Sequence, residues 1–271
     1  MGLVPPRSLS PSKVTAFRDC ALAFRFSAID RLPQPPTQAT TKGTLVHAAL
    51  ERLFWDNPPG ERTPDAAQAA LAAAWASMRT GADVTGLHLS PDQTAAFLDD
   101  ARALVANYFL LEDPDDVDAV GVELTLEAPV AGTRLRGIID RLDLDGGDLV
   151  IVDYKTGRAP TARNEQEKLL GVHLYAVLCE EVLGRRPARV RLLHLREPTV
   201  IEATPSEQAL RGHRVRAEAV WRAIERACDQ DDFRPRPGPL CPYCAFRDRC
   251  PAAGGTVPGP ARAAHSNEGA A

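Results

Sequence analysis

Hydrophobic residues recur at helical spacing through the N-terminal part of the chain. Residues 8–29 form the first such segment, with serines at its start that can cap a helix. A second helix is expected from Gly43 to the Asn-Pro-Pro-Gly turn at 57–60. Two further helices, of about 16 and 20 residues, should open at Thr63 and Ser90, where each cap residue precedes a proline and an aspartate.

The pattern then changes to β-branched and aliphatic residues, many of which alternate with polar ones. Three strands joined by glycine-containing turns are expected at 120–130, 134–144 and 149–154. A helix, two strands and a long arginine-rich helix should follow at 164–183, 189–195, 199–203 and 205–229. This order predicts an α/β core with a helical insertion at about 60–115, followed by a disordered tail at 252–271.

Composition limits the kinds of protein this can be. The 271-residue chain is 44% hydrophobic and 25% charged, which is ordinary for a globular protein. Its net charge of -4 argues against a histone-like binder with a broad positive field, but leaves room for DNA binding in a local groove. No apolar run is long enough to span a membrane, and the N-terminus lacks an apolar signal region, so we expect a cytoplasmic protein.

Two aspartates and a lysine follow apolar stretches on neighbouring predicted strands. Asp140 follows Gly-Ile-Ile, Asp153 follows Val-Ile-Val, and Lys155 comes two residues later. Because side chains alternate along a strand, Asp153 and Lys155 project to the same face. If the two strands pair through the turn at Gly146, Asp140 and Asp153 can meet at one end of the sheet.

Two carboxylates and an ammonium group suit metal-assisted hydrolysis of a phosphodiester. Carboxylate oxygens hold Mg²⁺ or Mn²⁺, which polarises the phosphate and lowers the pKa of a bound water. The spacing Asp-x-Lys also occurs in ordinary hairpins, but the preceding apolar strand, the following glycine and the second aspartate favour a catalytic site. Only four of the 32 basic residues are lysine, so a lysine at position 155 is more informative about function than it would be in a lysine-rich chain. Glu123, on the first strand, is either a further acid of this site or a solvent-facing residue.

Four of the six cysteines form a pattern. Cys241 and Cys244 make a C-x₂-C knuckle, Cys250 follows, and Cys20 ends the first expected helix. Without a signal region, structural disulfides are disfavoured, and four thiolates suit either tetrahedral zinc or an iron–sulfur cluster. The remaining two cysteines fall in helical patterns and should be buried: Cys179 and Cys228.

From about Leu9 to Pro251 the sequence resembles the RecB-type nucleases of the PD-(D/E)xK superfamily. The motifs that carry the resemblance are Gly43–His47, Gly137–Arg141 and Val152–Gly157. The resemblance implies a restriction-endonuclease-like α/β core, with a mixed central sheet flanked by helices. We therefore expect one nuclease domain over 1–251, which includes the helical insertion and a cysteine-rich, cluster-binding tail at 237–251.

The resemblance also implies roles for single residues. His47, Asp140, Asp153 and the Tyr154 carbonyl would hold the metal, and Lys155 would be the catalytic lysine. Ile139 stands where the superfamily's name has proline, as is usual in RecB-type members.

The helix after the lysine corresponds to one that contacts DNA in the family. Tyr175 matches the family's tyrosine, whereas Gly171 occupies the position of its usual glutamine. His173 is the candidate substitute for that glutamine.

Several RecB-type nucleases, including the AddB subunit of a helicase–nuclease and CRISPR-associated iron–sulfur nucleases, carry one cysteine before the nuclease core and three after it. By this resemblance, Cys20, Cys241, Cys244 and Cys250 would hold a [4Fe–4S] cluster, with zinc as the alternative. The cluster would join the N-terminal helix to the C-terminal tail, which is a structural rather than a redox role.

Together these features favour a metal-dependent DNA exonuclease that acts on single strands or DNA ends in repair or recombination. The chain lacks a Walker A motif, so helicase activity would need a partner. The alternatives are a non-catalytic DNA-binding or scaffold subunit of a helicase–nuclease complex, and a CRISPR spacer-processing nuclease. The many arginines of the C-terminal part are either a phosphate-binding surface or a solvated face.

Overall fold

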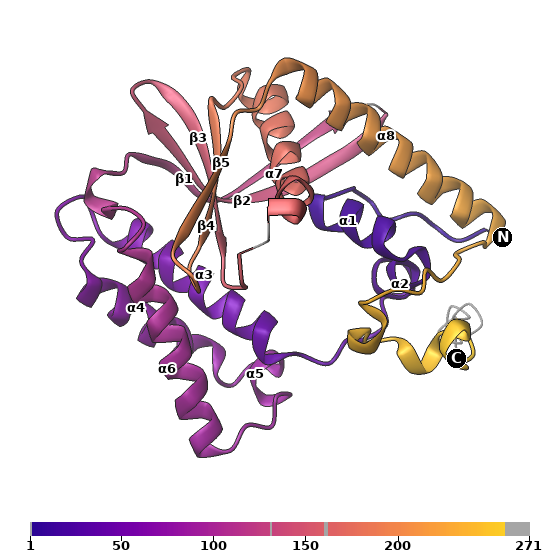
Figure 1. Ribbon diagram of the computed structural model, residues 1–271, viewed down its shortest axis with the longest axis horizontal. Helices are drawn as coiled ribbons and strands as arrows, with labels where there is room; N and C mark the ends of the chain where they lie inside the picture. The colour runs from indigo at the N-terminus through magenta and orange to yellow at the C-terminus, as the bar shows by residue number, and fades with distance from the viewer. Residues whose placement is uncertain (1, 131, 160–161, 258–271) are drawn as a thin grey trace, which may run out of the picture. The chain divides into compact units, whose positions relative to one another are not determined.

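The computed structural model describes residues 2–130, 132–159 and 162–257, without the side chains of 162–170. Within these residues a five-stranded sheet has the order β1-β2-β3-β4-β5 (Figure 1). Its strands are β1 (Ala119–Val130), β2 (Thr133–Asp145), β3 (Asp148–Lys155), β4 (Arg189–His194) and β5 (Thr199–Ala203). All neighbouring pairs are antiparallel except β3 with β4, which is parallel. The mixed sheet expected from the sequence is therefore confirmed.

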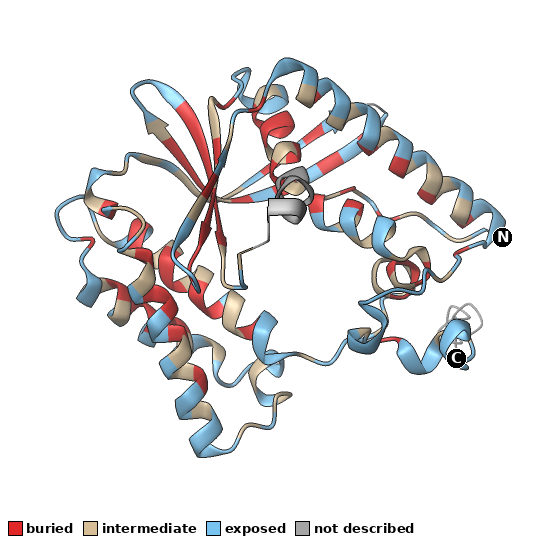
Figure 2. Cartoon of the chain, viewed as in Figure 1, coloured by how far each residue is buried: buried red, intermediate tan, exposed pale blue. Residues whose placement is uncertain are grey.

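Helices flank this sheet on two sides (Figure 1). On one side, α3 (Gln38–Asp56), α4 (Pro64–Met78) and α6 (Pro91–Tyr108) share a buried cluster with Val150, Val152 and Tyr154 of β3. On the other, α7 (Ala162–Leu183) forms the crossover that the parallel β3–β4 pair requires. Figure 2 shows the buried residues concentrated along the strands and on the helix faces turned toward them.

The expected helix starts at Thr63 and Ser90 are confirmed. The Thr63 hydroxyl accepts a hydrogen bond from the Ala66 amide, and Ser90 forms a capping box with Gln93. Proline at the first helical position needs no hydrogen-bond donor there, so both helices begin where the sequence places them.

Two expectations for the N-terminal segment are wrong. The helix expected over 8–29 is divided into α1 (Pro11–Asp19), α2 (Ala21–Phe24) and a π-helical turn, because Cys20 has an extended backbone with φ of -161°. The helix expected from Gly43 begins five residues earlier, at Gln38. Thr37 and Thr40 form a reciprocal capping box there, which fixes the helix start.

The remaining elements complete the chain in the expected order. The long C-terminal helix is α8 (Glu207–Gln230), and a short helix α5 (Ala82–Thr85) lies within the insertion. Short helical turns are η1 (Arg25–Ile29), η2 (Pro114–Asp116), η3 (Cys241–Tyr243), η4 (Arg247–Arg249) and η5 (Pro251–Ala253). The last part of the expected disordered tail, 258–271, lies outside the described residues. No helix in the described part of the chain is long and apolar enough to cross a membrane.

The chain divides into two compact units. The larger comprises Arg7–Val14 and Pro35–Trp221 and contains the sheet. The smaller comprises Met1–Pro6, Thr15–Gln34 and Arg222–Ala271. Within the smaller unit, Arg25 pairs with Asp231 at 2.7 Å, and the rings of Phe26 and Phe246 meet edge to face at 5.4 Å. These contacts join segments about two hundred residues apart in sequence.

One residue of β1 has an unusual backbone. Glu123 has φ of +46°, although its neighbours Val122 and Leu124 pair regularly with Arg141 and Ile139 of β2. A left-handed conformation costs a residue with a Cβ about 1–2 kcal/mol. Strain of this kind is kept where the surrounding structure needs the side chain in one place.

We predict that Glu123→Gly raises the free energy of unfolding by about 1 kcal/mol, because glycine adopts a positive φ without steric cost. Glu127→Gly is the matched control, since Glu127 lies on the same strand without a positive φ. It should lower the free energy of unfolding by about 0.5–1 kcal/mol, as glycine does in an ordinary strand. Urea denaturation measures both; an equal loss in the two variants would show that residue 123 is unstrained.

A second prediction concerns His213 on α8. Burial, followed by the charges of His173 and Arg216, lowers the pKa of His213 to about 4. The folded state therefore binds a proton less readily than the unfolded chain, whose histidine titrates near 6.5. The stabilising contribution is complete above pH 6.5 and is lost as the pH falls toward 4.

The unfolding free energy should therefore fall less steeply between pH 6.5 and 5 in His213→Gln than in the parent. The difference in slope should be smaller than the slope that uptake of one full proton on unfolding would give. His88→Gln, at an exposed histidine, should leave the decline as in the parent. Urea denaturation across this pH range tests the pair, and identical slopes in both variants would contradict the assignment.

Candidate active site

Asp140 and Asp153 lie side by side at one end of the β2–β3 pair. The last bridged residues there are Arg141 and Val152, which lie opposite each other. Because side chains alternate along each strand, their neighbours Asp140 and Asp153 both project to the other face. Just beyond the ladder, the Tyr154 amide donates to Asp140 Oδ2 at 2.8 Å. Asp153 is only 6% exposed, and Asp140 is half-buried. The folded chain thus brings together the two carboxylates that the strand pattern expected to meet.

Lys155 projects to the same face and forms an ion pair with the Asp153 carboxylate. Burial raises the pKa of Asp153, while the lysine charge acts in the opposite direction. Burial lowers the pKa of Lys155, but the charge and hydrogen bond of Asp153 outweigh it, and the pKa lies above its ordinary value. The lysine is therefore a protonated cation beside the two carboxylates at neutral pH.

His47 reaches the same place from α3. Its Nε2 lies 3.1 Å from the Tyr154 carbonyl oxygen, and its Nδ1 lies 3.5 Å from Asp140 Oδ2. Burial lowers the pKa of His47, but the hydrogen bond and the charge of Asp140 together raise it by more. The pKa of His47 therefore lies above its ordinary value. One turn earlier in α3, a Cβ on Gly43 would lie 3.3 Å from Thr156 Oγ1, so the glycine lets the helix approach the end of β3.

Glu123 joins His47 and Asp140. One ligand atom from each of the three side chains lies within 4.8 Å of the other two. Burial and the charge of Asp140 raise the pKa of Glu123, so the carboxylate shares its surroundings with the site. The sequence left this glutamate open between the site and the solvent. Glu123 has a positive φ at this position beside the site, a backbone conformation that the hydrophobic pattern of the sequence does not reveal.

These groups fit a divalent metal ion. His47 offers a ring nitrogen, while Glu123 and Asp140 offer carboxylate oxygens in one group. Asp153 Oδ2 is buried and is paired with the Lys155 ammonium group. A buried carboxylate oxygen is costly unless it is bound by a cation or donor. Oxygen-rich sets of this kind suit Mg²⁺ or Mn²⁺.

Tyr175 and His173 of α7 have different surroundings: the charges of the acids act on Tyr175, whereas His173 packs against α8. Burial and the charges of Asp153, Asp140 and Glu123 raise the pKa of Tyr175. The tyrosine ring packs where β2 has a glycine: a Cβ on Gly137 would lie 2.7 Å from Tyr175 Cε1. The His173 ring instead stacks on that of His213 of α8, with centroids 4.7 Å apart. Gly171 lies near Pro11 of α1.

The cysteine pattern falls in the smaller unit. Cys20 Sγ accepts a hydrogen bond from the Arg236 amide at 3.4 Å, and Cys241 Sγ accepts one from the Gly238 amide at 3.2 Å. Arg236 also donates to the Arg18 carbonyl at 2.8 Å, so Cys20 lies against the segment that precedes the knuckle. Amide donors to sulfur are characteristic of thiolate sites that hold iron–sulfur clusters.

The two other cysteines are buried within helices, as expected. Cys179 of α7 and Cys228 of α8 are fully buried. Burial raises the pKa of Cys179 to about 12 and that of Cys228 to about 11, so both are neutral thiols.

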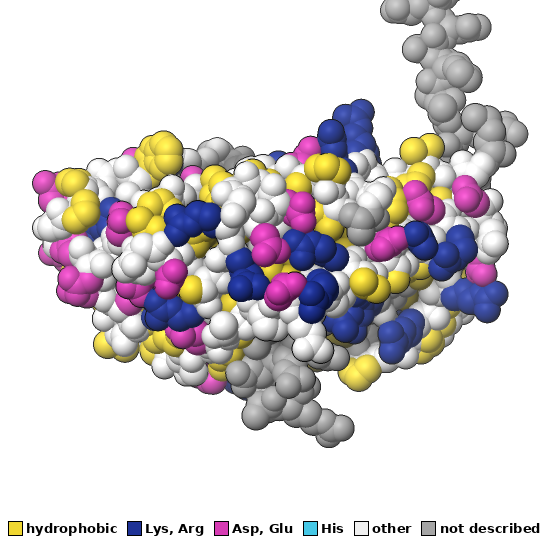
Figure 3. Space-filling view, turned by 90° about the horizontal axis from the view of Figure 1, so that it is seen from above, with side chains coloured by type: hydrophobic (Ala, Val, Ile, Leu, Met, Phe, Trp, Pro, Cys, Tyr) yellow, Lys and Arg dark blue, Asp and Glu magenta, His cyan; other side chains and the backbone are white. Residues whose placement is uncertain are grey.

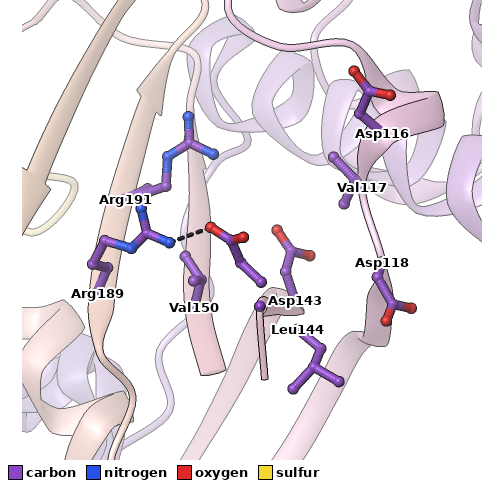
Figure 4. Close-up of a pocket in the computed structure, with 10 residues that line it drawn as sticks. Asp116, Val117, Asp118, Asp143, Leu144, Val150, Arg189 and Arg191 are labelled. Carbon is purple, nitrogen blue, oxygen red and sulfur yellow. Dashed lines mark hydrogen bonds and ion pairs between the residues drawn. The ribbon is translucent and has the colours of Figure 1, made fainter. Parts of the chain in front are cut away.

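A cavity of about 350 Å³ lies at the opposite end of the β2–β3 pair from the carboxylates, beside the Gly146 turn (Figure 4). Its charged groups are largely matched: Arg189 pairs with Asp145, and Arg191 pairs with Glu112 at 3.0 Å. Neither Asp140 nor Asp153 lines it. The cavity is therefore separate from the candidate active site.

Two arginines of α8 are paired with acids. Arg214 contacts Glu180 at 2.6 Å and Glu181 at 2.8 Å, and Arg211 contacts Glu207 at 2.5 Å. The face in Figure 3 accordingly mixes basic and acidic side chains rather than presenting one basic patch. These contacts favour the solvated-face interpretation of the arginine run.

Comparisons with known proteins address the fold. A solved structure named "Putative exonuclease", from Eubacterium rectale, aligns with a TM-score of 0.55 and 13% identity, covering 88% of this chain and 87% of that chain. The structure of SSO0001 aligns with a TM-score of 0.37 and 15% identity, over 78% of this chain and 85% of that chain, which is too low to bear on the argument. The search of curated proteins found no match.

The family comparison covers nearly the whole chain. The model of the PD-(D/E)XK nuclease superfamily matches residues 8–251, a span that includes His47, both aspartates and the lysine. The mixed sheet flanked by helices agrees with that assignment. The chain therefore belongs to the PD-(D/E)XK nuclease superfamily.

Proposed function

We propose that this protein is a metal-dependent DNA exonuclease that hydrolyses phosphodiesters with Mg²⁺ or Mn²⁺ and acts on single strands or DNA ends. The observation that carries the proposal is the convergence of Asp140, Asp153, Lys155 and His47 at one end of the β2–β3 pair. Membership of a nuclease superfamily supports the reaction class. The preference for ends rests on the RecB-type motifs and on the name of the Eubacterium rectale protein.

In this proposal His47, Asp140, Asp153 and the Tyr154 carbonyl hold the metal, and Glu123 is a further acid beside them. The bound ion would polarise the scissile phosphate and lower the pKa of a water. Lys155, held protonated by Asp153, stabilises negative charge on the phosphate oxygens as the phosphodiester bond breaks. Tyr175, which matches the family's tyrosine, would contact the DNA there.

We also propose that Cys20, Cys241, Cys244 and Cys250 hold a [4Fe–4S] cluster. The contact between the Arg236 amide and Cys20 Sγ supports this, since it brings the N-terminal cysteine to the segment before the knuckle. A cluster there would add a covalent connection between segments already joined by Arg25 and Asp231. A role in repair or recombination with a helicase partner is the biological setting that the RecB-type motifs favour.

Lys155→Ala should lower the rate of single-turnover cleavage of single-stranded DNA by about 10²–10³-fold, with DNA affinity little changed. The reason is that the ammonium group acts mainly on charge that develops in the transition state. Asp140→Ala or Asp153→Ala should instead weaken Mn²⁺ binding, so that excess Mn²⁺ partly restores cleavage.

Lys13→Ala, in α1, is the control and should cleave at the parent rate. A Lys155→Ala protein that cleaves as fast as the parent would show that the site is wrongly assigned. A parent that binds DNA but cleaves none with Mg²⁺ or Mn²⁺ would favour the scaffold alternative.

The cluster gives a separate prediction. Protein purified without oxygen should be brown and contain about four irons per chain. Cys20→Ala should lose the iron and lower the thermal midpoint, because the N-terminal segment is released from the tail. Cys228→Ala, which removes a buried thiol from the same unit, should keep the iron. Metal analysis that finds one zinc and no iron in such protein would reject the cluster.

A further inference from the structure

Arg141 follows Asp140 in β2 and is 0% exposed. Its Nε and Nη2 donate to the Asp143 carboxylate at 2.7 and 2.9 Å, and its Nη1 pairs with Glu112 at 2.6 Å. The guanidinium also lies over the ring of Phe54, 4.5 Å from its centroid. A charged group leaves water only at a large cost in free energy, so a buried arginine depends on this set of partners.

Two tyrosine hydroxyls complete the set. Arg141 Nη1 donates to the Tyr154 hydroxyl at 2.8 Å and to the Tyr108 hydroxyl at 3.1 Å. The Tyr108 hydroxyl in turn donates to Glu112 at 2.8 Å. Both tyrosines are buried and contact the same guanidinium nitrogen. They differ in where their backbones lie, because Tyr108 ends α6 whereas Tyr154 is in β3 between Asp153 and Lys155.

Tyr154 connects this network to the carboxylates. Its side chain points to the face opposite that of Asp153 and Lys155, because residues alternate along the strand. Its amide donates to Asp140 Oδ2 at 2.8 Å, and its carbonyl oxygen lies 3.1 Å from His47 Nε2. One residue is therefore fixed by its hydroxyl on one face of the sheet while its backbone orients site groups at the strand end.

We propose that Arg141 is a positioning residue for the metal site and acts through the Tyr154 hydroxyl. The hydrogen bond from Arg141 fixes the Tyr154 ring, the ring fixes the peptide groups on either side, and these orient Asp140 and the Tyr154 carbonyl toward the cation. The inference rests on the proposed nuclease function, since it assigns a role within that site. Mutation of a group that holds a metal ligand in place typically lowers metal affinity or activity by about 10–100-fold.

The competing explanation is that the network only stabilises the fold. Arg141 and its partners join β2, β3 and α6, so loss of any buried partner would lower stability. Metal affinity would then follow stability and would not depend on which hydroxyl is removed. The two tyrosines separate these explanations, because each gives a hydroxyl to the same arginine and only Tyr154 has its backbone in the site.

The experiment compares Tyr154→Phe with Tyr108→Phe in the full chain. Each substitution removes one hydroxyl and keeps the ring, so both variants should fold. The arginine itself is left in place because its removal would take away the ion-pair partner of the buried Asp143 carboxylate. Three quantities are measured for each protein: the thermal midpoint, the Mn²⁺ dissociation constant by calorimetry, and kcat and KM for cleavage of single-stranded DNA.

Both variants should have lower thermal midpoints than the parent. Tyr154→Phe should raise the Mn²⁺ dissociation constant by about tenfold or more and lower kcat at limiting Mn²⁺, with partial rescue by excess Mn²⁺. Tyr108→Phe should bind Mn²⁺ and cleave DNA as the parent does.

Equal Mn²⁺ affinity in all three proteins, with the parent cleaving DNA, would overturn the positioning role and leave the nuclease proposal standing. An equal loss of affinity in the two variants would also overturn it, since that is the result expected of a purely structural network. A parent that neither binds Mn²⁺ nor cleaves DNA would instead overturn the nuclease proposal, and the positioning role with it.

Discussion

The antiparallel register of β2 and β3 is the constraint on which the rest of the site depends. It pairs Arg141 with Val152, so that their neighbours Asp140 and Asp153 project together to the opposite face. Because side chains alternate, this register sorts two chemistries onto two faces: carboxylates and Lys155 on one, the guanidinium and Tyr154 on the other. A slip of one residue would exchange the faces, burying carboxylates in the core and moving the arginine toward the site.

Both faces are charged, but they differ in how far their charges are balanced. Arg141 is surrounded by Asp143 and Glu112, and it lies against an aromatic ring. On the other face, within the part of the chain whose side chains are described, the carboxylates Glu123, Asp140 and Asp153 have two cationic or titratable partners, Lys155 and His47, which leaves an excess of negative charge. That excess is the electrostatic basis for binding a divalent cation, and it also raises the pKa of His47.

The smaller unit has a different physical basis. Its segments come from both ends of the chain, and they are held by the Arg25–Asp231 ion pair and the Phe26–Phe246 contact rather than by a sheet. A unit assembled from both ends of the chain gains from a further connection that closes a long loop. This is the physical reason for giving the cysteine pattern a structural role.

The sequence by itself determined the strands, the capped helices and the placement of Asp153 and Lys155 at the end of β3, because periodicity and capping act over a few residues. Asp140 was expected at or near a strand end, but it lies within β2, which continues to Asp145. The sequence did not reveal the break at Cys20 or the early start of α3, since these depend on local backbone choices that compete closely. Only the tertiary structure decided that Glu123 joins His47, and that Tyr154 connects the site to Arg141. Those contacts join residues far apart in the chain, or on separate strands, so they follow from packing and register, which no local pattern contains.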